Sequence, residues 1–305
     1  MRRVQFSRIG PPDVLEVVEV DPPHPGRGEV RVRVRAAGIN PLDAKIFEGR
    51  PTANPHPVTF PSGNGGDFAG SIDELGEGVT GWGLGDPVLG GRQFHAQADF
   101  VVVTADRLVR IPDGLDIIQA GALDGVGRTA WATTASLGLG PDDIVFVSAA
   151  AGGVGALTAQ LARRVGATVI GSASESNHDF LRSIGVIPVT YGPGLAERLR
   201  AAAPGRLTAA LDNHGRESVD AALELGVSPE RINTIADYAA PKLYGVGFVG
   251  GSAAGPAQLS ELAALIAAGE IVLPIDSVFP VERVSQAYER LIAGHVTGKI
   301  VLTFD

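Results

Sequence analysis

The feature that most limits the fold of this chain is a buried-type strand that runs directly into glycines and then into a helix. The strand is expected at residues 144–148, the glycine-rich turn ends at Gly155, and an Ala- and Leu-rich helix is expected at residues 154–165. From about residue 119 onward, short apolar runs alternate with helical stretches in the same way. Such alternation is typical of βαβ units and predicts a doubly wound parallel sheet in the α/β class.

The other elements of this region are predicted from the same alternation. Strands are expected at residues 168–171, 186–189, 209–211, 231–235 and 244–249. Helices are expected at residues 177–183, 194–202 and 216–225, and the tail adds helices at 256–268 and 281–292 and a strand at 299–304. Before residue 119, short strand-like runs separated by Gly and Pro predict a compact, irregular β-barrel. They lie at residues 14–20, 29–37, 70–74, 86–89, 100–103 and 108–111.

The length of 305 residues suits two domains. Because the β-rich pattern gives way to the βαβ pattern near residue 119, we expect one domain at residues 1–118 and a second at 119–253. Residues 254–305 are expected to complete the first domain.

The glycine-rich turn has the context that a dinucleotide-binding fingerprint requires. Gly152 lets the backbone approach a pyrophosphate, and Gly155 lets the helix pack closely on the strand, while the helix N-terminus offers free N–H groups. We therefore expect the cofactor phosphates to lie against Ala151, Gly152, Gly153, Val154 and Gly155. Ala150 replaces the first glycine of the usual GxGxxG pattern, and a tight turn without a ligand is the alternative.

The choice of nucleotide is expected at the end of the second strand, where an acidic residue would bind the ribose hydroxyls of NAD. This chain has Ser172 and Ser174 there, and serine hydroxyls can donate hydrogen bonds to a 2′-phosphate. NADPH is therefore favoured over NADH. Asn177 and Tyr191 are further neutral partners, and a helix cap is the alternative role for Asn177.

Composition excludes several classes of function. The formal net charge is −9 and no Lys/Arg run is longer than a pair, which argues against nucleic-acid binding. The chain has no cysteine, so disulfides, thiolate nucleophiles and Cys-bound zinc are excluded. No apolar stretch is long enough for a membrane span and no signal core opens the chain, so we expect a cytoplasmic protein.

Taken together, the motifs of this chain resemble the quinone-oxidoreductase branch of the medium-chain dehydrogenase/reductase superfamily over nearly its whole length. The segments that carry the resemblance are AAGINPLD (36–43), GDFAG (66–70), GEGVT (76–80), GD (85–86), GRTAW (127–131), AAAGGVG (149–155) and HVTGKIVL (295–302).

The resemblance implies a GroES-like β-barrel domain built from both chain ends, a Rossmann domain between them, and an active site in the cleft. It also implies homodimers or tetramers. Zinc-dependent relatives hold their metal with Cys and His in the barrel domain, but the matching positions here are near Ile39 and Asn40 and in Gly65–Asp67. Both ligand types are absent from these positions, so no metal is expected.

Without a Lewis acid, hydride delivery to an electrophilic quinone or enone is easier than oxidation of an alcohol. The resemblance places Asn40, Asp43 and Lys45 beside the nicotinamide, where they are candidate donors to the acceptor oxygen, and Thr129 matches a nearby position. Local roles are the alternatives: a backbone turn for Asn40 and Asp43, surface charge for Lys45, and a helix hydroxyl for Thr129.

Further cofactor contacts follow from the resemblance. Gly247, Phe248 and Val249 lie in the segment that lines the nicotinamide ring, although core packing is an equal alternative for Phe248. Asp212 ends a strand and is expected near the ribose or nicotinamide. Lys299 is also expected to contact the cofactor. The roles of Arg128 and His95 stay open.

The leading hypothesis is therefore an NADPH-dependent, zinc-free reductase that acts on a small quinone or α,β-unsaturated carbonyl. An enoyl-thioester reductase of the same superfamily is one alternative, and a non-catalytic NADPH-binding sensor is another. Substrate identity depends on the loops at residues 47–60 and 90–98, which are rich in Gly and Pro or irregular.

Overall fold

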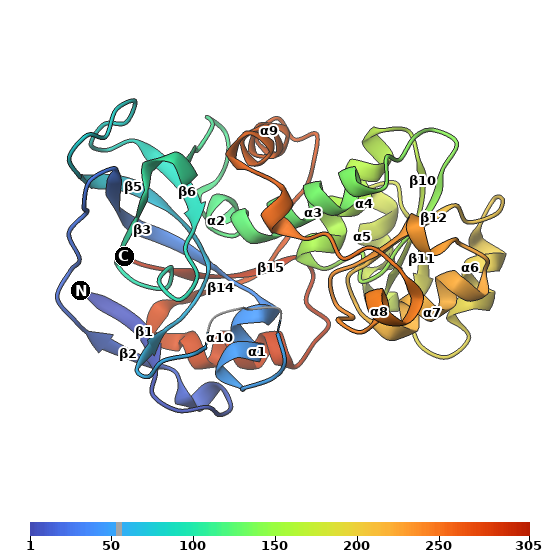
Figure 1. Cartoon of the computed structure of the whole chain (residues 1–305), viewed down its shortest axis with the longest axis horizontal. Coiled ribbons are helices and arrows are strands. Elements are labelled where there is room, and N and C mark those ends of the chain that lie inside the picture. Colours follow the sequence, from blue (N-terminus) through green and yellow to red (C-terminus); the bar gives the residue numbers. More distant parts are fainter. Residues whose placement is uncertain (53–56) are drawn as a thin grey trace. The chain divides into compact units, whose positions relative to one another are not determined.

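The computed structural model describes residues 1–52 and 57–305, so four residues of the expected substrate loop at 47–60 lie outside it. Within the described residues the chain divides into two compact units (Figure 1). Unit 1 consists of Met1–Gly125, Gly255–Ala268 and Ile275–Asp305. Unit 2 consists of Val126–Ala254 and Gly269–Pro274. The predicted fold class is confirmed, because unit 1 is built mainly on antiparallel strands, with one parallel pair, and unit 2 on a parallel sheet.

The division places residues 119–125 in unit 1, later than the expected boundary. Helix α2 (Ile117–Gly121) packs directly on the barrel strand β3 (Glu29–Ile39). A Cβ added to Gly121 would lie 2.7 Å from the Ala36 carbonyl oxygen, so the two backbones are in contact. This packing ties the start of the βαβ region to the barrel. A second difference is that residues 269–274 belong to unit 2.

Unit 2 contains a parallel sheet of order β11-β10-β9-β12-β13. Its strands are β9 (Ile144–Val147), β10 (Thr168–Ala173), β11 (Ile187–Thr190), β12 (Ala209–Asp212) and β13 (Ile232–Thr234). Its helices are α3 (Asp124–Ser136, whose first two residues belong to unit 1), α4 (Gly153–Arg164), α5 (His178–Ser183), α6 (Leu195–Ala202), α7 (Arg216–Glu224) and α8 (Ala240–Tyr244).

Helices cover both faces of this sheet (Figure 1). Val145 and Val147 of β9 pack in one core with side chains of α4 and α5. Phe146, which lies between them and so points to the other face, packs with side chains of α6 and α7. The apolar run of β9 is therefore buried on both sides, as its continuous hydrophobicity predicts.

Unit 1 contains a larger sheet of order β14-β15-β3-β5-β6-β8, with β7 paired to β3, and a smaller sheet of order β2-β1-β4. The strands not yet located are β1 (Arg2–Phe6), β2 (Glu16–Glu19), β4 (Ser62–Gly63), β5 (Asp67–Leu75), β6 (Pro87–Gly91), β7 (Phe100–Thr104), β8 (Val109–Arg110), β14 (Ile275–Pro280) and β15 (Lys299–Thr303). Strand β15 joins the N-terminal part through antiparallel pairing with β3, so both ends of the chain build one unit.

Short helices pack around the core of unit 1. Helix α1 (Pro41–Phe47) lies beside α10 (Val284–Ile292), where the Phe47 and Tyr288 rings meet edge to face with centroids 5.1 Å apart (Figure 1). Helix α9 (Pro256–Ala267) packs near β8. The 3₁₀ turns of the chain are η1 (Pro12–Val14), η2 (Ala105–Arg107), η3 (Glu175–Asn177), η4 (Pro229–Arg231), η5 (Gly251–Ala253) and η6 (Val281–Arg283).

Local structure differs from the expected strand in one segment and from the alternative of a backbone turn in another. The segment at 244–249 is not a strand, because α8 ends at Tyr244 and the following residues make only an isolated bridge between Gly247 and Asn233. The segment after Asn40 is a helix rather than a turn: Pro41 suits its first position, and Asp43 accepts the Asn40 backbone N–H at 2.9 Å. In the part of the chain that the structure describes, no helix is long and apolar enough to cross a membrane.

Candidate functional site

The glycine-rich turn between β9 and α4 is closed by backbone contacts. Ala149 adopts a positive φ of 47°, and its carbonyl oxygen accepts the Gly152 N–H at 2.9 Å. A Cβ at Gly155 would lie 2.1 Å from that oxygen, so no side chain fits there. A Cβ at Gly152 would meet nothing nearer than the same oxygen, at 3.3 Å. A side chain is thus excluded at Gly155, whereas Gly152, where α4 begins, has a single tight neighbour.

The carboxyl ends of neighbouring strands are tied together by Asp212, the last residue of β12. Its carboxylate is buried and accepts hydrogen bonds from Ser148 Oγ at 2.7 Å and Thr234 Oγ1 at 2.6 Å. It also accepts the backbone N–H groups of His214 and Gly215. These contacts occupy both carboxylate oxygens, so the structure places Asp212 as a brace of the sheet edge, and a direct cofactor contact stays a prediction.

Asn213, which sequence reasoning missed, lies against the glycine turn. Its backbone N–H donates to Ser148 Oγ at 2.8 Å, and its Nδ2 donates to the Ser148 carbonyl at 3.0 Å. Its Oδ1 is buried and accepts no hydrogen bond from the residues that the structure describes. A buried acceptor of this kind calls for a donor. An open glycine backbone, a helix N-terminus and this acceptor at one sheet edge fit a dinucleotide.

The end of β10 holds the residues predicted to choose the nucleotide. Ser172 is only 2% exposed, so its hydroxyl does not reach the surface. Its carbonyl oxygen accepts the Ala150 N–H at 2.8 Å. Ser174 is partly exposed, with its Oγ 3.0 Å from Ser176 Oγ. Asn177 follows at the end of η3. Ser174 is therefore the better placed of the two predicted serines.

The remaining predicted residues of unit 2 are spread along the same sheet edge. Tyr191 is 38% exposed and its ring centroid lies 6.0 Å from that of His214. Val249 exchanges hydrogen bonds with the Asn233 side chain, at 2.7 and 3.0 Å, which holds the Gly247–Val249 segment beside β13. Phe248 is 40% exposed rather than part of the core, so it is available to a ligand.

Thr129 and Arg128 lie in α3 of unit 2. A Cβ at Gly251 would lie 2.9 Å from Thr129 Oγ1, so these two residues are in close contact. Arg128 donates to the Ala254 carbonyl at 3.1 Å. In unit 1, Lys45 is partly exposed in the last turn of α1.

A polar cluster in unit 1 surrounds Asn40, at the start of α1. The Asn40 Nδ2 donates to Asp67 Oδ2 at 3.0 Å, and the Lys299 ammonium donates to Asn40 Oδ1 and, at 2.8 Å, to the Ile39 carbonyl. Lys299 Nζ lies 3.7 Å from Asp67 Oδ2. Asp43, Asp67 and Lys299 are buried, whereas Asn40 is partly exposed. The cluster fixes the orientation of the Asn40 amide and leaves that amide accessible.

Lys299 is thus placed in this cluster of unit 1, where its ammonium is bound to protein groups, and a cofactor contact stays a prediction for it. Asp67 was considered from the sequence only as a replacement for a zinc ligand. The cluster joins residues from β3, β5 and β15, and no local sequence pattern links these strands. The continuous apolar run that follows Lys299 indicates a buried strand, and a lysine at the start of a buried strand is a signal for a charged partner.

Burial sets the electrostatics of the cluster. Burial, followed by the nearby charge of Asp67, raises the pKa of Asp43 to about 6. Burial also lowers the pKa of Lys299, against the opposing effect of Asp67 and Asp43. Around Asp43, Gln93 Nε2 donates to Oδ1 and Tyr288 OH donates to Oδ2, both at 3.3 Å. The Asn40 and Gln93 donors favour the ionised carboxylate and so partly offset the effect of burial on the pKa of Asp43.

The raised pKa of Asp43 predicts a pH-dependent loss of stability. The ordinary pKa is 3.8 and the folded value is about 6, so the native state holds its proton longer than the unfolded state does. The free energy of unfolding should therefore fall by about 3 kcal/mol as the pH rises from about 4 to about 7. Urea unfolding of the wild type and of Asp43→Asn at several pH values checks this. The difference between them should change with pH in this window, and a constant difference would contradict it.

The cluster does not fit a zinc ion. Asp67 accepts the Asn40 amide and, through Oδ1, the Gly125 N–H at 3.0 Å, and the Lys299 ammonium faces it. Among the described residues no three His, Cys, Asp or Glu side chains gather as a metal site. The chain also has no cysteine.

Residues 26–113 match the alcohol dehydrogenase GroES-like domain, and residues 181–302 match a family model described as zinc-binding dehydrogenase. A quinone oxidoreductase of Pseudomonas aeruginosa is 30% identical over 326 aligned positions, which cover 99% of each chain. The chain belongs to the quinone oxidoreductase family. It is therefore an oxidoreductase of the medium-chain dehydrogenase/reductase superfamily, as predicted.

One solved structure belongs to another quinone oxidoreductase, and one relative is a protein of a different kind. The structure of the quinone oxidoreductase from Coxiella burnetii aligns with a TM-score of 0.88 and 28% identity, covering 100% of this chain and 99% of that one. Polyketide synthase GfsB of Streptomyces halstedii is 32% identical over 90% of this chain, but the match covers only 5% of that much longer protein.

Proposed function

We propose that this quinone oxidoreductase family member is an NADPH-dependent reductase of a small quinone or α,β-unsaturated carbonyl and that it works without zinc. The observation that carries the proposal is the β9–α4 turn, which excludes a side chain at Gly155 and has none at Gly152, the N-cap of α4. Such a turn lets a pyrophosphate approach the backbone N–H groups at the start of α4. The buried, unpartnered Asn213 Oδ1 beside the turn supports the same ligand.

When bound, the reduced nicotinamide supplies a hydride, and the residues of unit 1 act on the acceptor. Asn40 has one amide hydrogen bonded to Asp67 and is partly exposed, so its second amide hydrogen is available to an acceptor oxygen. Lys299 and Asp67 hold that amide in one orientation. In this proposal the acceptor takes its final proton from water. Homodimer formation and a cytoplasmic location remain predictions from the sequence.

The zinc-free part of the proposal rests on the donor set. The carboxylates of the unit 1 cluster are bound to Asn40, Gly125 and the Lys299 ammonium. A cation would have to displace Lys299 and find His or Cys ligands, which this cluster lacks.

A rate assay with several acceptors tests the proposal. NADPH oxidation should be fast with benzoquinone or naphthoquinone and much slower with a 2-enoyl thioester. The polyketide synthase relative makes an enoyl-thioester reductase the second candidate, and turnover of the thioester alone would establish that candidate instead. Saturable NADPH binding with no oxidation of NADPH by any acceptor would contradict both reductase hypotheses and support the non-catalytic sensor.

The nucleotide preference gives a separate prediction. Ser174→Asp places a negative charge at the partly exposed end of β10, where it should repel a 2′-phosphate. The ratio of kcat/KM for NADPH to that for NADH should fall by about tenfold or more, which corresponds to about 1.4 kcal/mol. Ser183→Asp, at an exposed position in α5, adds the same charge elsewhere and should leave the ratio unchanged. Equal effects of the two substitutions would refute the assignment of Ser174.

A further inference from the structure

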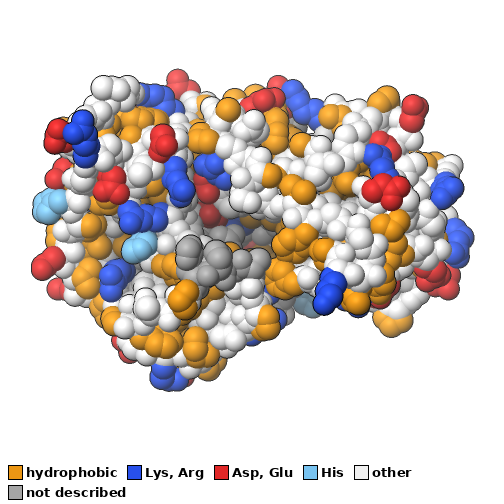
Figure 2. Space-filling model, viewed as in Figure 1, with side chains coloured by type: hydrophobic (Ala, Val, Ile, Leu, Met, Phe, Trp, Pro, Cys, Tyr) orange, Lys and Arg blue, Asp and Glu red, His pale blue; other side chains and the backbone are white. Residues whose placement is uncertain are grey.

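A pocket of about 380 Å³ lies in unit 1, lined by parts of β1, the segment after β2, the segment between β6 and β7, and β7 itself. Its apolar wall includes Val20, Phe100 and Val101, and its charged residues include Arg3 and Arg92. Its volume falls in the range of small-molecule sites. Figure 2 shows Arg or Lys and His side chains next to one another on the visible face of this unit.

The two arginines of the pocket lack negative partners. Arg3 donates from Nη2 to Gln5 Oε1 at 2.7 Å, and Arg92 donates from Nη1 to the Val102 carbonyl. Within the described part of the chain neither guanidinium forms an ion pair, and the Arg3 Nε is buried with no acceptor. The formal charge of the chain is −9, so carboxylates outnumber cationic side chains, and yet these two arginines have no carboxylate partner among the described residues. Several N–H donors of both side chains remain available.

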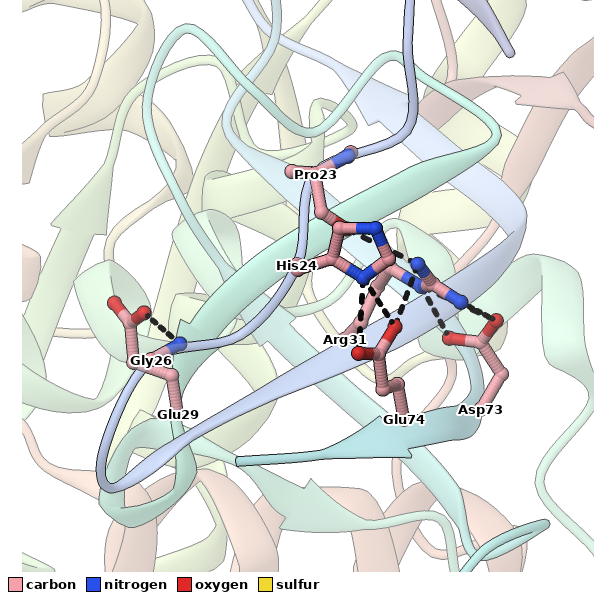
Figure 3. Close-up of polar contacts among 7 residues, drawn as sticks. All are labelled: Pro23, His24, Gly26, Glu29, Arg31, Asp73 and Glu74. Atoms are coloured by element: carbon pink, nitrogen blue, oxygen red, sulfur yellow. Dashed lines mark hydrogen bonds and ion pairs between the residues drawn. The ribbon is translucent and has the colours of Figure 1, made fainter. Parts of the chain in front are cut away.

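Arg31, which contacts the pocket-lining residue Pro23 but does not itself line the pocket, shows the opposite arrangement (Figure 3). Arg31 donates to both Asp73 oxygens at 2.9 to 3.2 Å and lies 2.7 Å from Glu74, which also contacts His24 Nδ1 at 3.0 Å. Glu29 accepts the Gly26 N–H at 3.0 Å. The positive charge of Arg31 is therefore balanced by protein carboxylates, as an arginine without a ligand usually is.

His95 is the third positive candidate in the pocket and follows Arg92 by three residues. Its partial burial, followed by the charges of Arg92 and Arg3, lowers the pKa of His95. All three side chains line the same pocket, so they repel one another when charged. An anion between them would remove this repulsion and raise the pKa of His95 again.

We propose that Arg3, Arg92 and His95 bind a small molecule through an oxyanion group, either a carboxylate or a phosphate. Guanidinium groups present parallel N–H donors that match both of these groups, and the apolar wall accommodates the rest of the molecule. The carboxylates of Asp21 and Glu29 also line the pocket, so the anionic end is directed to the side of the two arginines. This site is independent of the proposed redox function.

The site shares a segment with the polar cluster of unit 1. Between Arg92 and His95, Gln93 donates to Asp43 Oδ1, and Phe94 has a positive φ of 69°. A strained non-glycine residue of this kind persists where the surrounding contacts require it. A ligand that fixes Arg92 and His95 therefore also fixes the segment that contacts Asp43.

Histidine ring NMR of the full chain tests the site, with inorganic phosphate and benzoate as the probes. The His95 signal is identified by its loss in His95→Gln. We expect a saturable shift of this signal and a raised pKa of His95 with one or both probes, but not with sodium chloride at the same ionic strength. Benzoate alone would assign a carboxylate ligand, phosphate alone a phosphate ligand, and both the shared oxyanion chemistry.

Arginine variants complete the test. Arg3→Gln and Arg92→Gln should each weaken binding of the effective probe by about tenfold or more, because a charge-assisted hydrogen bond is lost. Arg27→Gln is the matched control, since the Arg27 side chain is 82% exposed and lies outside the pocket lining. The proposal is overturned if neither probe gives a saturable shift, or if Arg27→Gln weakens binding as much as Arg92→Gln does.

Discussion

Gly155→Ala is expected to lower the free energy of unfolding by about 1 to 3 kcal/mol or more and to weaken NADPH binding by at least about tenfold. The new Cβ would lie 2.1 Å from the Ala149 oxygen and 2.9 Å from the Ala150 Cα. Both atoms belong to the backbone, so the clash cannot be relieved by a side-chain rotation. The turn itself must open, and the start of α4 must move with it. Urea unfolding and a fluorescence titration with NADPH measure the two effects.

Two other glycines separate stability from binding. Gly152→Ala places a methyl group 3.3 Å from the Ala149 oxygen, a tight contact but far milder than the 2.1 Å clash at Gly155, so it should reduce NADPH affinity with a smaller loss of unfolding free energy than Gly155→Ala. Gly140→Ala has open space in the loop before β9 and should change neither quantity. If Gly155→Ala binds NADPH as the wild type does, or if Gly152→Ala has no effect on affinity, the turn is not the cofactor site.

Lys299→Met is expected to destabilise the chain by about 3 to 5 kcal/mol, because it leaves Asp67 as a buried charge without its cation. The side chains of Lys299 and Asp67 are each only 4% exposed, and their charged atoms lie 3.7 Å apart. Thermal and urea unfolding measure the loss. Adding Asp67→Asn to Lys299→Met should restore part of the stability, and the double-mutant cycle isolates the pair.

The same variant separates two roles for Lys299. As a positioning residue for Asn40, it should affect kcat for the acceptor and leave the dissociation constant of NADPH unchanged. As a cofactor contact, which the sequence predicts, it should change that constant directly. A loss of NADPH affinity in Lys299→Met without a loss of stability would contradict the placement of Lys299 in the buried cluster.

The sequence was sufficient to predict the five strands of the unit 2 sheet, because their signals are local, although it also predicted a further strand at 244–249. The run at Ile144–Val147 is apolar on both faces, and the glycines that follow allow contacts that no side chain permits. The helices after β9, β10 and β11 each begin within a residue or so of the predicted position. In this region the local sequence pattern and the tertiary packing favour the same strands and helices, and such elements can be predicted from sequence alone.

The cluster around Asn40 could not be predicted from the sequence, because its members come from distant strands. Asp67 and Lys299 meet Asn40 only through the pairing of β5 and β15 with β3. Helix α1 was also missed, since its seven residues are too few to show a helical period and its Asn-Pro start is typical of a turn.

The missing strand at 244–249 has a different cause. Valine and phenylalanine in this segment favour a strand, but the side chain of Asn233 takes the hydrogen bonds of Val249 that a neighbouring strand would take. Backbone hydrogen bonds with β13 are made at Gly247, but at Val249 the Asn233 side chain replaces them, and Phe248 between these two residues is 40% exposed. Tertiary contacts override the local preference at this position.

The measurement that tests the central claim most directly is the steady-state oxidation of NADPH with benzoquinone by the purified chain after dialysis against a metal chelator. The account predicts undiminished turnover after chelation, a higher kcat/KM with NADPH than with NADH, and no gain on adding zinc. Absence of turnover, or turnover that is lost on chelation and restored by zinc, would contradict it.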